Sequence, residues 1–326
     1  MEPLFWMGGR LATDLTEISH DLEDLKKPGF WAVIGSFEAE WTLARFATVT
    51  NSDLPHSDTP WIPLESTSWI STMTSEEYCR YVEEIRNHIS QGDVYQVNAC
   101  RILQSEQNKN KNLLGLVQRI LQHNPAPFAS YISLPSVEIA SASPERFLSV
   151  KGKIALSSPI KGTSSTDQFL EKDHAENLMI VDLIRNDMSS TARVGSVTTP
   201  RLLATEKHPG LFHLVSDVRS EIAEGKSVVD LLQSMMPPGS VSGAPKSSAL
   251  EIIRKNEGVR GPYCGAIGWV EGSRAELAVG IRTFWHERDG VLKFGTGAGI
   301  TWGSDPMQEW NETELKARRL IGLTTS

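Results

Sequence analysis

Residues 128–158 read FASYISLPSVEIASASPERFLSVKGKIALSS and hold four short apolar segments: FASYISL, VEIASA, ERFLSV and KIALSS. Proline or glycine separates each segment from the next, as is typical of strands joined by turns. Strands that follow one another this closely pair antiparallel, because a parallel pair needs a long crossover connection. The stretch therefore predicts successive strands of an antiparallel sheet.

The segments on either side extend this pattern. Thr74 and Glu77 form a capping box at the start of one helix, and Gly92 can end that helix. Asp305-Pro306 starts the last helix, which Gly322 should end. Further strands are predicted at 30–37, 265–270, 276–285 and 291–301, and further helices at 170–187, 228–236 and 246–257. Because the strands come in groups, the predicted fold class is α+β rather than a doubly wound sheet.

The composition is that of an ordinary globular protein. Of 326 residues, 40% are hydrophobic and 22% charged, which excludes a disordered chain and a coiled coil. Lys and Arg number 32 against 40 Asp and Glu, and the net charge of −8 argues against a nucleic-acid partner. An anionic small substrate would need cations gathered locally to hold it.

Targeting signals and cysteine usage indicate the compartment. The N-terminal stretch MEPLFWMGGRLATDL lacks a basic start followed by a long apolar core, so no signal peptide is expected. No apolar run approaches the roughly 20 residues of a membrane span. Cys79, Cys100 and Cys264 are far apart, which predicts core residues rather than disulfides or zinc ligands. We therefore expect a cytoplasmic protein without a membrane partner.

Two predicted helices place acidic residues on unexpected faces. Asp173 and Glu176 share a face with Met179, Ile180 and Leu183, which should be buried. A buried carboxylate is costly unless it is paired, protonated or bound to metal. Alternatively, Glu176 belongs to the first helical turn, where anions are favoured.

The last helix repeats the arrangement. Glu309, Glu312, Thr313 and Lys316 lie on one face, which can be an ordinary solvated surface with a Glu312–Lys316 ion pair. The two acid pairs could instead converge on one hard cation such as Mg²⁺, which prefers oxygen ligands.

Glycine-rich segments and one arginine suggest an anion site. GTGAG (295–299) and PPGSVSGAPKSS (237–248) lack the spacing of nucleotide-binding loops, so they predict tight turns or exposed backbone N–H groups. On the predicted strand 276–285, Arg282 follows small residues on one face. A guanidinium there can bind a carboxylate or form a structural salt bridge.

Taken together, these segments resemble the chorismate-utilising enzymes, which include the anthranilate, isochorismate, salicylate and aminodeoxychorismate synthases. The resemblance spans residues 75–320, and residues 1–70 carry little of it. The matching motifs, in order, are GDVYQVN (92–98), SASPERF (141–147), SPIKGT (158–163), AENLMIVDLIRND (175–187), HLVS (213–216), PPGSVSGAPK (237–246), RGPYCGAIG (260–268), GIRT (280–283), GAGI (297–300) and EWNETELKA (309–317).

This resemblance implies a fold and a metal site. Residues 1–326 should form a single catalytic domain, with two large antiparallel sheets packed as a sandwich and helices outside. The family's Mg²⁺ site falls on Glu176 and Glu312, with Asp173 and Glu309 acting through water. The cation would neutralise and orient the ring carboxylate of chorismate.

The same resemblance implies how substrate is held. The pyruvyl carboxylate of chorismate would contact a tyrosine, an arginine and backbone groups. Lys316 would lie near the ring carboxylate. The full set of implied substrate-binding residues is Gly162, Thr163, His213, Tyr263, Arg282, Gly297, Ala298, Gly299 and Lys316.

Two positions distinguish the subfamilies. Isochorismate and salicylate synthases carry a lysine base where this chain has Gln96, so attack by water is disfavoured. Anthranilate synthases usually have alanine where this chain has Lys161, and PIKGT resembles aminodeoxychorismate synthases.

Lys161 would add at C2 of chorismate as the C4 hydroxyl leaves, and ammonia would then enter at C4. Glu145 would protonate the departing hydroxyl, unless it merely pairs with Arg146.

The implied product is 4-amino-4-deoxychorismate, a precursor of 4-aminobenzoate and folate. An anthranilate synthase that carries a lysine is the first alternative, and a non-catalytic chorismate-binding subunit is the second. None of the three cysteines has the setting of a glutaminase nucleophile, and we expect no room for a glutaminase domain in 326 residues. Ammonia is therefore expected from a separate glutamine amidotransferase subunit.

Overall fold

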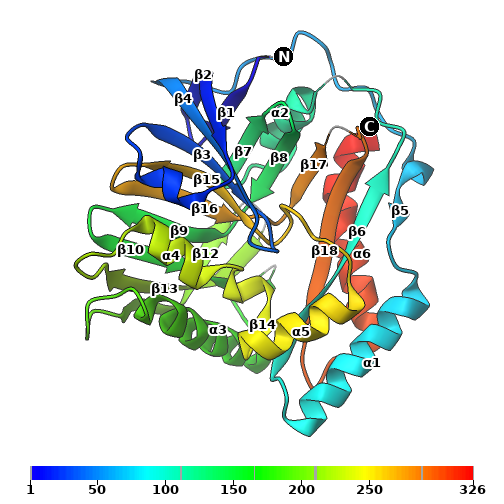
Figure 1. Cartoon of the computed structure of the whole chain (residues 1–326). Helices are drawn as coiled ribbons and strands as arrows, with labels where there is room; N and C mark the ends of the chain where they lie inside the picture. The colour runs from blue at the N-terminus through cyan, green and yellow to red at the C-terminus, as the bar shows by residue number, and fades with distance from the viewer. Residues whose placement is uncertain (1, 111, 165, 209–210, 288, 326) are drawn as a thin grey trace.

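The computed structural model describes residues 2–325 except 111, 165, 209–210 and 288 (Figure 1). Its strands are β1 (Leu4–Met7), β2 (Arg10–Ser19), β3 (Phe30–Gly35), β4 (Trp41–Asn51), β5 (Ile70–Ser71), β6 (Gln96–Ser105), β7 (Phe128–Ser133), β8 (Val137–Ser143), β9 (Arg146–Lys151), β10 (Ile154–Ser158), β11 (Ile160–Ser164), β12 (Thr198–His208), β13 (Leu211–Glu221), β14 (Gly243–Ala244), β15 (Ala266–Glu271), β16 (Arg274–Val279), β17 (Thr283–Glu287) and β18 (Leu292–Ile300). Its α-helices are α1 (Ser75–Gln91), α2 (Leu114–His123), α3 (Glu171–Ser189), α4 (Val228–Met235), α5 (Lys246–Asn256) and α6 (Pro306–Thr325).

The described strands form one continuous antiparallel ladder with two halves. In the first half, β13 pairs with β10, β11 and β12, and the ladder continues through β9, β16, β15, β3, β4 and β2. In the second half, β7, β8, β17, β18 and β6 follow one another, with β5 and β14 paired to β6. Strand β1 pairs with both β2 and β7 and so joins the halves (Figure 1). The predicted α+β class is confirmed, and the two expected sheets are halves of one ladder.

The chain crosses between the two halves at Pro144 and Glu145. The predicted strands of 128–158 all form, but β8 pairs with β7 and β17 whereas β9 pairs with β10 and β16. Consecutive strands β8 and β9 therefore belong to different halves, and the short connection between them lies where the halves meet.

A second crossing corrects the prediction of one strand over 276–285. The chain leaves the first half at the end of β16 and enters the second half at β17. Between them, a Cβ atom on Gly280 would lie 2.0 Å from the carbonyl oxygen of Pro262, so this close approach admits only glycine. Arg282 adopts a φ of 53°, in the left-handed region that side chains rarely occupy. The alternating pattern does not reveal that the strand changes partners midway.

The two crossings are bonded to each other. The Ser143 hydroxyl donates to the carbonyl oxygen of Val279 over 2.7 Å, and the Val279 N–H donates to the carbonyl oxygen of Glu145 over 3.0 Å. The Ala142 N–H donates to the carbonyl oxygen of Arg282 over 3.0 Å. Each crossing thereby satisfies backbone groups that the other leaves outside regular pairing.

The helices follow their sequence signals, with two exceptions. The capping box of α1 forms as predicted, and the Gln308 N–H donates to Asp305 at the start of α6 over 2.9 Å. However, α6 continues past Gly322, because its Thr324 carbonyl oxygen accepts hydrogen bonds from the Leu64 N–H (2.8 Å) and from a tryptophan side chain. Helix α2 was not predicted, although its apolar face is buried against the second half.

Replacing Ser143 by alanine tests the connection between the crossings. The Ser143→Ala variant removes this donor, although the Val279 carbonyl oxygen still accepts the Ile281 N–H over 2.7 Å, and the net contribution of one such hydrogen bond is about 0.5–1.5 kcal/mol. We expect the free energy of unfolding in urea to fall by about that amount. The exposed Ser247→Ala variant is the control and should change stability by less than about 0.5 kcal/mol. Equal stability of the two variants would contradict the role given to Ser143.

Candidate active site

Glu145 and Arg282 occupy the two crossings and so face the junction of the halves. Glu145 is 4% exposed. Burial raises the pKa of Glu145 to about 7, although a hydrogen bond from Ser240 and the charges of Lys161 and Arg282 act in the opposite direction. Burial, together with the like charge of Arg319, lowers the pKa of the Arg282 guanidinium. Arg146 pairs with Glu276 over 2.7 Å, so the alternative Glu145–Arg146 ion pair does not form.

Lys161 lies on β11 within the electrostatic reach of Glu145 at the first crossing. Desolvation lowers the pKa of Lys161, against the attraction of Glu176 and Glu145 for its charged form. The neighbouring Gly162 has a φ of +83°, and a Cβ atom there would lie 3.0 Å from the Cβ of Asp173. Glycine at position 162 therefore lets the Lys161 strand pack closely against α3.

The four predicted metal-site carboxylates come from α3 and α6. Desolvation raises the pKa of Glu176 and of Glu309, and in each case a neighbouring acid adds to the shift. Desolvation would also raise the pKa of Glu312, but Lys316 holds that pKa below its ordinary value through a 2.5 Å ion pair. Asp173 accepts the Leu170 N–H over 2.9 Å and so caps α3.

These acids are near one another, but their side chains are not arranged as a preformed metal-binding site. Glu176 and Glu312 interact electrostatically across the two helices. Among the described residues, no three Asp, Glu, His or Cys side chains converge closely enough to hold a metal ion. Asp173, rather than Glu176, caps the start of α3. The predicted ion pair between Glu312 and Lys316 forms.

The predicted substrate-binding residues on β18 lie beside Lys316. The ammonium group of Lys316 donates to the carbonyl oxygen of Gly297 over 3.1 Å. Ala298 is buried between its two glycine neighbours. A Cβ atom on Gly299 would lie 2.3 Å from the side-chain nitrogen of Gln96, which is 2% exposed. Glycine is therefore required where β18 packs against Gln96.

The remaining predicted residues lie at the edges of this group. His213 is buried on β13, opposite Thr163 in the ladder with β11. The side chain of Thr163 lies outside the described part of the structure. Tyr263 is buried, and a Cβ atom on Gly295 would lie 2.0 Å from its ring, so the ring packs directly on β18.

Ser240 is a site residue that sequence reasoning missed. The glycine-rich segment 237–248 was expected to form turns, and Gly239–Val241 does form a short 3₁₀ helix. The Ser240 side chain is buried and hydrogen-bonds to the carboxyl group of Glu145. Only the tertiary fold brings these residues together, because 95 positions separate them in the sequence.

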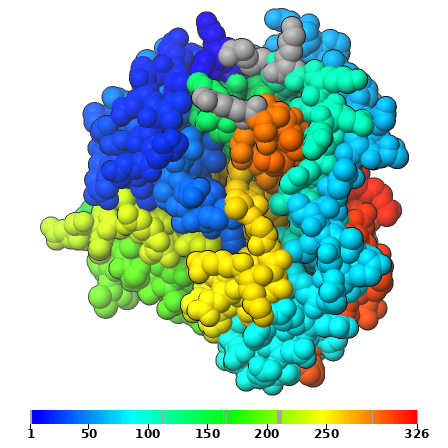
Figure 2. Space-filling model, turned by 45° about the vertical axis from the view of Figure 1, so that its right-hand side comes forward, coloured from blue at the N-terminus to red at the C-terminus, as the bar shows by residue number. Residues whose placement is uncertain are grey.

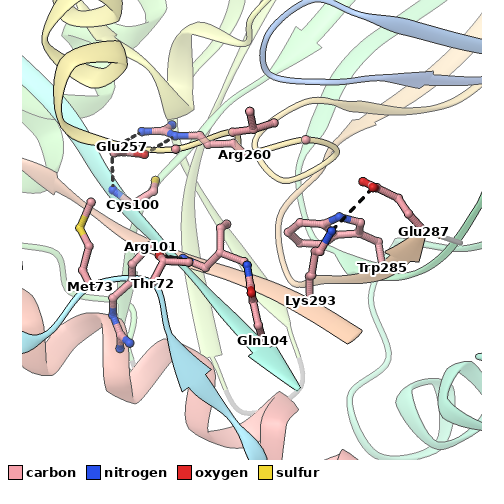
Figure 3. Close-up of a pocket in the computed structure, with 14 residues that line it drawn as sticks. Thr72, Met73, Cys100, Arg101, Gln104, Glu257, Arg260, Trp285, Glu287 and Lys293 are labelled. Atoms are coloured by element: carbon pink, nitrogen blue, oxygen red, sulfur yellow. Dashed lines mark hydrogen bonds and ion pairs between the residues drawn. The ribbon is translucent and has the colours of Figure 1, made fainter. Parts of the chain in front are cut away.

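A separate cavity of about 370 Å³ contains none of the predicted site residues. Its lining segments meet on the face shown in Figure 2, where the yellow chain around α5 lies beside the cyan chain of α1. In Figure 3, Glu257 accepts from Arg260 over 2.7 Å and from the Cys100 N–H over 3.0 Å, and Lys293 pairs with Glu287 over 3.7 Å. Cys100 lines this cavity and also packs against Gly297 of β18.

Comparison with known proteins shows the family. A model of the chorismate binding enzyme family matches residues 37–322, so the match begins nearer the N-terminus than the resemblance read from the sequence. The chain belongs to this family. We find no helix among the described residues that is both long and apolar enough to cross a membrane.

Individual relatives carry several names. Aminodeoxychorismate synthase component 1 of Bacillus subtilis is 33% identical over 299 residues, which cover 87% of this chain and 61% of that protein. Anthranilate synthase component 1 of Aquifex aeolicus is 35% identical over 269 residues, which cover 78% and 54%. The chain therefore spans about half to three fifths of the length of these relatives.

Solved structures share the fold. Anthranilate synthase component I from Streptococcus pneumoniae has a TM-score of 0.80 at 22% identity, covering 98% of this chain and 89% of that one. The menaquinone-specific isochorismate synthase of Escherichia coli has a TM-score of 0.81 at 17% identity, covering 99% and 89%. At these identities the likeness establishes the architecture alone.

Replacing Glu145 by glutamine tests its predicted role as a general acid. If it protonates a leaving group, kcat should fall by about 10²–10⁴-fold in Glu145→Gln. With a pKa of about 7, Glu145 is protonated at lower pH, so wild-type kcat/KM should decline as the pH rises through about 7.

The variant should lose this limb of the pH profile. Glu276→Gln, which removes the partner of Arg146 on the neighbouring strand, is the matched control and should keep it. An unchanged profile in Glu145→Gln would show that another group is the acid.

Proposed function

We propose that the protein aminates chorismate at C4, with Lys161 as a covalent nucleophile, and so makes 4-amino-4-deoxychorismate. The observation that most directly supports this proposal is the interaction between Lys161 and Glu145. The pKa of Lys161 is lowered, and the buried carboxyl group of Glu145, which interacts with it electrostatically, has a pKa of about 7. Such a pair can supply a neutral amine and a protonated acid at the same pH. These are the two forms that addition with loss of water requires.

The proposed reaction has two displacements. The neutral amine of Lys161 forms a bond to C2 while both conjugated ring double bonds shift and the C4–O bond breaks. Glu145 gives its proton to the departing oxygen, and water leaves. Ammonia then bonds to C4, both ring double bonds shift back, and the C2–N bond breaks to release Lys161 as the neutral amine. The product carries the new nitrogen as an ammonium group, and Glu145 is left ionised.

Cationic groups on the facing elements would hold the substrate carboxylates. Arg282 projects from the second crossing, and burial makes a charge-assisted hydrogen bond to a carboxylate stronger than it would be in water. Tyr263 and the backbone of 297–299 form the neighbouring wall. Lys316 on α6 would lie toward the ring carboxylate, next to the acids of α3 and α6.

The donor set of those acids fits Mg²⁺. Asp173, Glu176, Glu309 and Glu312 offer only carboxylate oxygens, which this cation prefers. Raised pKa values at Glu176 and Glu309 reflect desolvation and mutual repulsion, both of which a bound cation would relieve. Glu176 and Glu312 would be direct ligands, and the other two would act through water. When bound, the cation would neutralise the ring carboxylate of chorismate.

An anthranilate synthase activity is the second candidate, because a relative with that name is 35% identical. It would place nitrogen at C2 and leave Lys161 without a covalent role. A non-catalytic chorismate-binding subunit would have no use for the nucleophile and acid pair. Relatives named component 1 also support the proposal that a glutamine amidotransferase subunit supplies the ammonia.

Intact-protein mass spectrometry tests the covalent role of Lys161. With chorismate and Mg²⁺ but no ammonia, we expect a mass increase equal to chorismate minus water, located on Lys161 by peptide mapping. Lys161→Ala should show no adduct and should lose C4 amination with ammonium, leaving anthranilate as the product. Anthranilate from the wild-type protein, or unchanged C4 amination in Lys161→Ala, would refute the proposed mechanism.

Replacing Glu176 by glutamine tests the cation site. Loss of a direct ligand should weaken Mg²⁺ binding, measured by calorimetry without substrate, by more than about tenfold, since even indirect partners of a ligand contribute about 10–100-fold. Glu171→Gln, in the exposed first turn of α3, is the matched control. Equal Mg²⁺ affinity in both variants would remove Glu176 from the site.

A further inference from the structure

The ionised Glu145 left after each turnover must regain a proton before it can act again. We propose that Asp187, paired with Lys246, returns this proton to Glu145 through Ser240 and one buried water site. This inference rests on the proposed function, because only a general acid needs such a supply. Asp187 is thus a positioning and proton-relay residue that does not touch the substrate.

A small cavity lies between the segments that carry the two acids. It has a volume of about 10 Å³, and both Glu145 and Asp187 line it, together with Ser240. This volume is at the lower limit for one water molecule, and a buried water needs about two to four polar partners. Glu145, Ser240 and Asp187 all line the cavity and carry groups that can serve as such partners, so the cavity suits a single bridging water.

The Ser240 hydroxyl lies at the inner end of this route. It hydrogen-bonds to Glu145, and a hydroxyl can accept one proton while it donates another. The segment that carries Ser240 is held in place by Arg260, which donates to the Val241 carbonyl oxygen over 3.1 Å. A Cβ atom on Gly239 would lie 3.6 Å from a carboxylate oxygen of Asp187, so this segment runs directly beside the acid.

The Asp187–Lys246 pair forms the outer end. The Lys246 ammonium donates to Asp187 over 2.6 Å and to the Met235 carbonyl oxygen over 3.1 Å. The Asp187 side chain is 9% exposed and that of Lys246 is 16% exposed, so the pair reaches the surface while its inner side faces the cavity. Protons can therefore enter from solvent without passing through the substrate site.

The charges around both acids favour proton exchange near neutral pH. Lys161 and Arg282 face Glu145, whereas Lys246 faces Asp187. Burial raises the pKa of Asp187 to about 6, close to the value of about 7 for Glu145. The two pKa values are consequently close enough for a proton to pass readily from Asp187 to an ionised Glu145.

This route supplies the proton that each turnover consumes. Each turnover consumes chorismate, ammonia and the proton of Glu145, and it yields water and a product bearing an ammonium group. One proton from solvent passes to Asp187, through the water and the Ser240 hydroxyl, and onto Glu145. No oxidant, reductant or further reactant is required.

Asp187→Asn tests the relay by separating the first turnover from later ones. Asparagine keeps an acceptor for Lys246 but carries no exchangeable acid proton. Enzyme equilibrated at pH 6 starts with Glu145 protonated, so on mixing with chorismate, Mg²⁺ and ammonium the first turnover should match the wild-type rate. Later turnovers should be slower by about tenfold or more, below the roughly 10²–10⁴-fold effect of losing a direct general acid. The progress curve should therefore show a burst of one product per enzyme, with KM for chorismate unchanged.

Two controls separate the relay from a structural role. Asp187→Asn/Lys246→Met removes the unpaired lysine, so a defect caused by a stranded charge would recover, whereas loss of the relay would persist. Glu276→Gln removes a different half-buried ion pair and should show no burst. A linear progress curve in Asp187→Asn, or full recovery in the double variant, would overturn the relay. A wild-type protein that does not aminate chorismate at C4 would instead overturn the proposed function.

Discussion

The hydrogen bonds between the two crossings are the constraint on which the rest of the site depends. A chain that moves from one half of the ladder to the other must interrupt its backbone pairing, and buried backbone groups cannot stay unpaired without cost. Here each interruption satisfies the other, through Ser143 and the backbone of Val279. The crossings therefore stay where the halves meet, and Glu145 and Arg282 are carried there with them. Two opposite charges are thus placed by backbone bonding rather than by attraction for each other.

Burial at this junction then sets the protonation states. A carboxyl group removed from water becomes a weaker acid, and an amine removed from water becomes a weaker base. Glu145 and Lys161 move in these opposite directions, so their pKa values approach each other. The same desolvation acts on Glu176 and Asp187 at the two flanks. One flank has acids that a cation would relieve, and the other has an acid already neutralised by Lys246, which is why the two flanks suit different tasks.

Local signals predicted the secondary structure well, and tertiary partners explain what they missed. The strands of 128–158 and the capping box of α1 depend on nearby residues, so the sequence shows them directly. The break at Gly280–Arg282 depends on Pro262, and the extension past Gly322 depends on partners of Thr324. The acidic faces of α3 and α6 were visible as an anomaly, but only the family resemblance gave them a candidate role. Ser240 and Asp187 lie in the matching motifs, but the sequence gave neither of them a role, because each acts only through a neighbour distant in the chain.

The net charge of −8 also bears on how an anionic substrate could bind at this site. A dianionic substrate approaches an acidic protein against repulsion, so its binding depends on the short-range distribution of charge rather than on the total. Lys161, Arg282 and Lys316 supply positive charge around the junction, while the acids of α3 and α6 would cancel much of it. With both sets present, a bound divalent cation is the simplest way to leave the site attractive to two carboxylates. In the proposed function, a preference for Mg²⁺ and the raised pKa values of Glu176 and Glu309 would both follow from the carboxylates that α3 and α6 bring near one another.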